Sequence, residues 1–262
     1  MGLTNQSTGQ STVREIFNAP ANDCDYIIAL AGNPNTGKST VFNALTGLRQ
    51  HTGNWPGKTV QRAEGSYVYK GLRYKLIDLP GTYSLLPNSA DEEIARDFIC
   101  FAGPDATIVV VDATCLERNL NLALQVMEIT GKVIVCVNLI DEARRKKISV
   151  DTDKLSKFLD VPVVATAARS GEGLPRLIEL VSDVTSGRIQ PKPHPVRYSQ
   201  EVEDAIALLE PRVQAIVGES INSRWLTLRL LDGDTRLVQT IEKYLNTGKK
   251  VPMVPVRQEE FA

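Results

Sequence analysis

The sequence predicts an α/β fold: a doubly wound, mostly parallel six-stranded sheet with one antiparallel strand, followed by a small all-helical domain. Apolar runs alternate with segments of helical periodicity between residues 24 and 186. Some of these runs, such as 108–111, are apolar at every position, which is typical of strands covered by helices on both faces. After a Pro-rich segment at 190–195 the pattern changes, and apolar residues recur only at helical spacing.

The individual elements follow from these runs and from the turn residues between them. Expected strands cover residues 26–31, 65–69, 73–78, 106–112, 132–137 and 161–165, and expected helices cover residues 39–46, 89–101, 119–130, 154–159 and 174–184. Lys70 and Gly71 favour a tight hairpin turn, so the second and third strands should run antiparallel. In the helical part Pro211 interrupts the first apolar stretch, and we expect a new helix to begin there.

Length and composition set the domain organisation. The 262 residues have room for one α/β domain at 24–186 and a smaller unit of linker and helices at 187–250, with a loose polar arm at 1–23 and an extended tail at 251–262. The net charge of −1 gives no reason to expect nucleic acid as a partner. The four cysteines form no C-x-x-C pair, which favours a reducing compartment over a disulfide framework or a zinc site. No apolar run approaches 18 residues, so we expect no membrane span in this chain, which we take for a piece of a longer protein.

Residues 32–40 match the phosphate-binding pattern G-x-x-x-x-G-K-[ST] at every fixed position, Gly32, Gly37, Lys38 and Ser39. The run follows an apolar strand and opens a helix, which is the context that the motif requires. Glycines let backbone N–H groups face the phosphates, and the helix N-terminus adds partial positive charge. We expect Lys38 to reach the β- and γ-phosphates and the hydroxyl of Ser39 to bind Mg²⁺. The remaining expected contacts in this loop are Asn33, Pro34, Asn35, Thr36 and Thr40.

The nucleotide base is predicted by Asn138-Leu139-Ile140-Asp141, an N-x-x-D pattern at the exit of a buried strand. The carboxylate of Asp141 can accept both N1–H and the N2 amine of guanine. Adenine lacks this pair of donors and would leave the charge desolvated and unpaired. The side chain of Asn138 can tie the base segment to the phosphate loop. The expected ligands are therefore GTP and GDP.

Two further segments complete a nucleotide site. Asp78 ends the third expected strand, where it can hold Mg²⁺ through water, and the N–H of Gly81 can sense a γ-phosphate. Thr59 follows Lys38 at the distance where a first switch loop supplies a Mg²⁺ ligand. The expected nucleotide contacts in these segments are Gly57, Lys58, Thr59, Asp78, Leu79, Pro80 and Gly81.

These motifs together resemble the cytosolic N-terminal GTPase region of the bacterial ferrous-iron transporter FeoB. Residues 52–57 (TGNWPG) and 78–85 (DLPGTYSL), followed by Asp91-Glu92 and Ala95-Arg96, are similar to the switch regions of that family. The resemblance covers about residues 24–262 and implies a Ras-like P-loop GTPase (G) domain and the family's helical domain. It implies a switch that regulates or drives Fe(II) uptake at the cytoplasmic face of the bacterial inner membrane. The implied partner is a membrane-embedded transporter domain of the same protein. Small accessory proteins of the iron-uptake system and a homo-oligomer stay open as further partners.

The resemblance and the residues also bear on hydrolysis. Ras-like GTPases orient the attacking water with a Gln just after Asp-x-x-Gly, but Thr82 and Tyr83 stand there in this chain, which predicts slow intrinsic hydrolysis. In FeoB-like GTPases an Asn at the position of Asn35 coordinates K⁺, whose charge replaces that of an arginine finger. The resemblance thus implies K⁺ as a cofactor beside Mg²⁺. The catalytic candidates are Asn35, Lys38, Thr59 and Gly81.

The second guanine segment departs from the common Ser-Ala-Lys pattern and reads Ala167-Ala168-Arg169. We expect the backbone N–H of Ala168 to contact guanine O6. Because this contact uses the backbone, it does not need the serine. The missing hydroxyl at Ala167 is expected to loosen the loop and to speed nucleotide release.

Alternatives stay open at this point. Trp55 is either a switch residue that moves with the nucleotide or a buried anchor. The acidic run 91–93 is better interpreted as the first turn of a helix than as an iron-sensing cluster. The alternative functions are a free-standing ribosome- or tRNA-associated GTPase, which the near-neutral charge disfavours, and a nucleotide-gated binding module with negligible catalysis.

Overall fold

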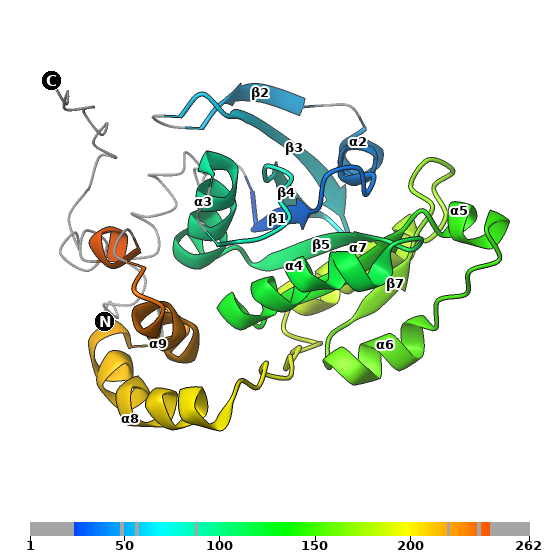
Figure 1. The fold of residues 1–262 in the computed structure, drawn as a ribbon. Coiled ribbons are helices and arrows are strands. Elements are labelled where there is room, and N and C mark those ends of the chain that lie inside the picture. Colours follow the sequence, from blue (N-terminus) through cyan, green and yellow to red (C-terminus); the bar gives the residue numbers. More distant parts are fainter. Residues whose placement is uncertain are drawn as a thin grey trace, which may run out of the picture.

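The computed structural model describes residues 24–47, 50–55, 58–86, 89–218, 221–234 and 237–241, and it confirms the expected fold class. Figure 1 shows a central sheet with helices on both faces, and with α8 and α9 at the end of the molecule away from α5 and α6. The described sheet has the order β2-β3-β4-β1-β5-β6-β7. Its strands are β1 Tyr26–Gly32, β2 Gln50–Asn54, β3 Gln61–Tyr69, β4 Leu72–Asp78, β5 Ala106–Asp112, β6 Val133–Asn138 and β7 Val163–Ala165. The helices are α2 Lys38–Thr46, α3 Ala90–Asp97, the π-helical turn η2 Phe98–Ala102, α4 Leu116–Ile129, α5 Ile140–Arg145, α6 Thr152–Leu159, α7 Leu174–Thr185, α8 Gln200–Val217 and α9 Ser223–Leu231.

Among the described strands, β3 alone runs against the others. It pairs antiparallel with β2 on one side and with β4 on the other, whereas β4, β1, β5, β6 and β7 pair in parallel. Lys70 and Gly71 join β3 to β4 with φ angles of 51° and 80°, and two successive positive φ angles are what a tight hairpin turn of this kind requires. The single antiparallel strand and its turn are therefore as predicted.

Three elements differ from the expectation. β2 is a seventh strand, and its polar residues give no apolar pattern because it lies at the sheet edge and is held by backbone pairing with β3. α5 is a short helix that begins within the segment 138–141. No new helix begins at Pro211, since α8 runs through it. The proline removes one backbone donor, but Ile206, Val213 and Val217 stay buried on either side of it, and their burial holds the helix together.

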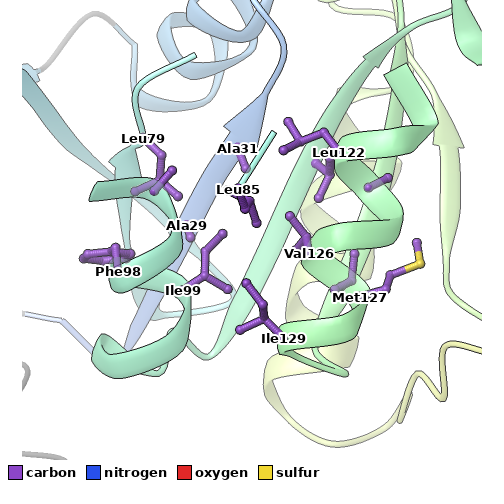
Figure 2. Packing of buried hydrophobic residues seen from close by; sticks show 14 of the residues in the cluster. Ala29, Ala31, Leu79, Leu85, Phe98, Ile99, Leu122, Val126, Met127 and Ile129 are labelled. Atoms are coloured by element: carbon purple, nitrogen blue, oxygen red, sulfur yellow. The ribbon is translucent and has the colours of Figure 1, made fainter. Parts of the chain in front are cut away.

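Two apolar clusters cover the two faces of the sheet. α2 and α7 pack over one face. On the other face, α3, η2 and α4 pack over β1 and β5. Figure 2 shows this second cluster, in which Leu85 lies near Ala31 and between the helix that carries Ile99 and the helix that carries Val126. The segment that follows Asp78 is therefore anchored in the core at Leu85.

The helical part packs on the same face as α4. Trp225 and Leu226 of α9 belong to the apolar cluster that includes α3 and α4. The hydroxyl of Tyr198 donates to Glu128 of α4 at 2.6 Å. Residues 190–199 form neither helix nor strand and connect α7 to α8. Within the described part of the chain, no helix combines the length and the apolar content that crossing a lipid bilayer would need.

Buried charges join α3 to the helical part. The guanidinium of Arg96 is 1% exposed and pairs with Asp97 at 2.8 Å and with Asp234, which follows α9, at 3.2 Å. Near Asp97 on the same helix, Glu93 pairs with Lys58 at 2.7 Å. Burial raises the pKa of Asp97 to about 6, although the charge of Arg96 acts to lower it. Because a buried charge is costly once its partner is lost, this group fixes how α3 meets the helical part.

The raised pKa of Asp97 predicts a pH dependence of stability. A carboxyl group with a higher pKa in the folded chain than in the unfolded chain, where it is about 3.9, binds its proton more tightly when folded. The free energy of unfolding contributed by this group should therefore rise by about 1 kcal/mol as the pH falls from 7 to 5. Urea unfolding at both pH values should show this rise in the wild type relative to Asp97→Asn. Equal pH dependence in the two proteins would contradict the assignment.

Candidate functional site

Residues 33–37 form a tight loop between β1 and α2. Asn35 and Gly37 have positive φ angles of 68° and 79°. The hydroxyl of Thr36 donates to the carbonyl of Asn33 at 2.9 Å and closes the loop. A Cβ atom on Gly37 would lie 2.4 Å from Nδ2 of Asn138, so a glycine is needed for this close approach. The N-terminus of α2 follows directly, and the loop therefore has the geometry of an anion site.

The lysine of the loop meets the carboxylate at the end of β4. Nζ of Lys38 donates to Oδ1 of Asp78, and the two side chains are 10% and 16% exposed. Burial raises the pKa of Asp78, while the Lys38 ammonium acts in the opposite direction. The strand register explains the meeting, because Asp78 lies opposite Leu30, near the end of β1. Lys38, which the sequence assigns to the phosphates, and Asp78, which it assigns to Mg²⁺, are thus neighbours. Ser39 and Thr40 are exposed in the first turn of α2.

The side chain of Asn138 joins three segments at the end of β6. It is 1% exposed. Its Nδ2 donates to the carbonyl oxygen of Thr36 at 2.9 Å. Its Oδ1 accepts from the hydroxyl of Thr166 at 3.0 Å and from the N–H of Ala168 at 3.1 Å. The phosphate loop, the base segment at 138–141 and the second base segment at 166–169 are therefore held together through one carboxamide.

Thr166 is a residue of this site that the sequence analysis missed. It is fully buried, and its Oγ1 also lies 3.1 Å from Sγ of Cys136. Its carbonyl oxygen accepts from the N–H of Ile140 at 3.1 Å. The signal in the sequence is weak, since a threonine that follows a short strand is common. The role of Thr166 depends on its hydrogen bond to Asn138, and only the arrangement of the strands shows that the two residues are neighbours.

The base segment places Asp141 in the first turn of α5. Leu139 adopts a positive φ of 62° just before this helix. Asp141 is half-buried, and Nη2 of Arg145 lies 3.8 Å from its Oδ2. Ala167 and Ala168 are buried. Since the N–H of Ala168 donates to Asn138, a contact with guanine O6 would have to share this hydrogen.

The segment after Asp78 lies against the phosphate loop. The N–H of Thr82 donates to the carbonyl of Gly32 at 3.3 Å. A Cβ on Gly81 would lie 3.6 Å from Cα of Pro34. Thr82 is buried and Tyr83 is half-exposed. Neither side chain carries a carboxamide that could orient water. Of the other expected contacts here, Leu79 is buried and Pro80 is half-buried.

The first switch segment is placed in part. Gly57 lies outside the described residues. Lys58 pairs with α3, as described above, and Thr59 is exposed. Trp55 is 2% exposed, and its ring meets that of Phe98 edge to face with centroids 5.5 Å apart. Of the two roles considered for Trp55, the described conformation has the buried anchor.

The acidic run 91–93 forms the first turn of α3, and the hydroxyl of Ser89 caps it by accepting from the N–H of Glu92 at 3.3 Å. Across the described residues, no three His, Cys, Asp or Glu side chains gather in a way that could hold a metal ion. The interpretation of these acids as a helix start is confirmed.

The fold and the site define a P-loop G domain with a helical unit attached. A family model described as ferrous iron transport protein B matches residues 26–181, and a model of the FeoB cytosolic helical domain matches residues 198–254. The chain belongs to the FeoB family.

Similar proteins agree with this assignment. The Fe(2+) transporter FeoB of Salmonella typhimurium is 41% identical over 212 residues, which are 79% of this chain and 27% of that protein. A fusion of Fe(2+) transport protein A with the Fe(2+) transporter FeoB, from Porphyromonas gingivalis, is 36% identical over 80% of this chain and 25% of its own length. The chain therefore spans about a quarter of the length of these relatives. The solved cytosolic domain of T. maritima FeoB in a GDP form is 38% identical with a TM-score of 0.76, and the match covers 88% of this chain and 89% of that one.

Removing the carboxamide of Asn138 should loosen all three segments at once. We expect Asn138→Ala to lower the free energy of unfolding by about 3 kcal/mol, because three hydrogen bonds are lost and their buried partners are left unpaired. The melting temperature should fall by about 6–12 °C. Thermal and urea unfolding measure the change.

A matched control is Asn119→Ala, which removes a carboxamide that is 5% exposed and bonds to Asp112 and Cys115 but not to the phosphate loop. It should cost stability without faster hydrogen exchange in residues 32–40. If hydrogen exchange in that loop were unchanged in Asn138→Ala, the claim that Asn138 holds the loop to the base segments would be contradicted.

Proposed function

We propose that this chain binds GTP and GDP and hydrolyses GTP slowly, as the switch of a ferrous-iron transporter. The observation that carries the proposal is the bond from Asn138 to Thr36, which joins a phosphate loop to a segment ending in a carboxylate at Asp141. A loop for phosphates and a carboxylate for a purine edge, held at fixed separation, fit one nucleotide. The GDP form of the T. maritima relative supports the same choice of base.

The proposed phosphate contacts come from the loop itself. Its backbone N–H groups and the ammonium of Lys38 would bind the phosphates, and the N–H of Gly81 would meet the γ-phosphate. Mg²⁺ would be held by the hydroxyl groups of Ser39 and Thr59 and, through water, by the carboxylate of Asp78. These are the oxygen ligands that Mg²⁺ takes, and Asp78 lies beside the lysine of the loop as such a site needs. When bound, Mg²⁺ neutralises charge on the phosphate oxygens.

The charge of an arginine finger would be supplied by K⁺ at Asn35. The side chain of Asn35 is exposed at the turn of the loop, where an amide oxygen is free to meet a cation beside the phosphates. The residues after Gly81 offer no water-orienting amide, which supports slow hydrolysis in the absence of the ion.

We further propose that the switch acts on a membrane-embedded part of the same protein at the cytoplasmic face of the inner membrane. The relatives are Fe(2+) transporters about four times as long as the matched segment. Movement of the 78–86 segment would reach the helical part through α3, because Arg96 binds Asp234 across that boundary. Accessory proteins and self-association belong to the same proposal.

The choice of base can be tested by changing its chemistry. Xanthine carries an oxygen where guanine carries the N2 amine, so an amide at position 141 would suit xanthine and oppose guanine. We expect Asp141→Asn to weaken GDP binding by about tenfold or more and to strengthen xanthosine diphosphate binding, measured by calorimetry. Glu142→Gln is the matched control, because Glu142 lies in the same turn and also approaches Arg145, at 3.5 Å, and it should keep the guanine preference. A wild-type chain that binds ADP as tightly as GDP would refute the proposal.

The proposed role of Asn35 predicts a dependence on the monovalent cation. GTP turnover by the wild type should be faster in K⁺ than in Na⁺ at equal ionic strength, by about tenfold or more. Asn35→Asp should lose this difference, and its melting temperature should stay close to that of the wild type because the side chain is exposed. Equal rates in the two salts, or a variant that keeps the K⁺ response, would refute the proposed role of K⁺ at Asn35.

A further inference from the structure

Asn33 is a buried residue of the phosphate loop whose side chain has no partner. It is 2% exposed, and neither Nδ2 nor Oδ1 finds a hydrogen-bond partner among the described residues. Elsewhere in the site the polar side chains of Lys38, Asn138 and Thr166 are all paired. Burying a carboxamide without hydrogen bonds is costly, so an unpaired one in a native protein calls for an explanation.

The surroundings of Asn33 indicate an explanation. Its two neighbours in sequence both meet the segment after Asp78, since Gly32 accepts from the N–H of Thr82 and Pro34 lies against Gly81. Along β1, alternate residues up to Ala31 face the cluster that contains Leu85. Figure 2 shows Ala31 close to Leu85 on this face. Asn33 is the first residue after β1, and if the alternation carried on by one more step its side chain would face the side where residues 81–85 run.

That segment is held firmly at one end and weakly at the other. The N–H of Leu85 donates to Oε1 of Gln125 at 2.7 Å, and Leu85 itself is in the core. Toward the phosphate loop, the bond from Thr82 to Gly32 is 3.3 Å long and therefore weaker. A reorientation of residues 81–83 would therefore break the longer bond to Gly32 and could keep the anchor at Leu85.

We propose that Asn33 is a positioning residue, whose carboxamide binds the peptide groups of residues 81–83 when Gly81 turns toward a γ-phosphate. The inference rests on the proposed function and adds to it the residue that stabilises the conformation with a triphosphate bound. A carboxamide carries two donors and two acceptor sites, so it can pair with a peptide N–H or a peptide carbonyl in the new orientation. The unpaired amide raises the free energy of the conformation described here, and it gains hydrogen bonds in the conformation in which Gly81 has turned toward the γ-phosphate. This difference favours GTP over GDP.

The experiment compares Asn33→Leu, which keeps the branched shape of the side chain without its polar atoms, and Asn33→Ala with the wild-type chain. Affinities for GDP and for a non-hydrolysable GTP analogue are measured with Mg²⁺, and melting temperatures without nucleotide. Whatever either substitution does to GDP binding, the affinity for the analogue should fall about tenfold further. The melting temperature of Asn33→Leu should equal or exceed that of the wild type, because the unpaired amide is gone.

Thr107→Val is the matched control. The hydroxyl of Thr107 is also fully buried without a partner among the described residues, but it lies near the start of β5, at the opposite edge of the sheet from the phosphate loop. This variant should keep or raise the melting temperature and leave the ratio of the two affinities unchanged.

One result would overturn the inference: an unchanged ratio of the two affinities in both Asn33 variants, whether the affinities stay as they are or fall equally together with the melting temperature. An equal fall would mean that Asn33 only supports the loop. A wild-type chain that binds neither nucleotide would instead overturn the proposed function.

Discussion

The site depends on one buried carboxamide. Asn138 ends a fully buried strand and bonds to the phosphate loop on one side and to Thr166 and Ala168 on the other. The loop can approach because residue 37 is a glycine, whose missing Cβ leaves room for Nδ2. Three loops that would otherwise move independently thereby share one rigid reference, the carboxyl edge of the sheet. A ligand that bridges phosphate and base positions then meets a preformed site and pays less ordering entropy on binding.

The same edge of the sheet also carries the parts that can move. The 78–86 segment begins at Asp78, which is paired with Lys38, and is anchored again at Leu85 in the core. Beyond it, α3 carries Arg96, which is buried against Asp234 of the helical part. A change at the phosphate loop therefore has a continuous packed path to the helices, and buried charges make that path sensitive to small displacements. The proposed function requires more than this spatial connection. Nucleotide at the phosphate loop and the membrane part at the helical end must both shift the same conformational equilibrium.

Much of the fold could be predicted because its strands are buried on both faces. The runs in β1, β5 and β6 are mostly apolar, and the phosphate and base motifs mark the ends of β1 and β6. β2 could not be predicted in this way, since an edge strand of polar residues depends on backbone pairing with β3. The helix start predicted at Pro211 was wrong because the tertiary packing of α8 outweighs the local effect of the proline. Thr166 was missed, and the unpaired carboxamide of Asn33 was not foreseen, for a related reason: what distinguishes them is a partner, or the lack of one, and a linear sequence does not display partners.

Amide hydrogen exchange with and without GDP tests the central claim, that Asn138 makes the phosphate loop and both base segments one unit. The account predicts that GDP with Mg²⁺ slows exchange by similar factors in residues 32–40, in residues 138–141 and at the N–H of Ala168, which donates to Asn138. ATP should give no such protection. Slower exchange in the phosphate loop with no change at Ala168 would contradict the account, because the segments would then bind nucleotide independently.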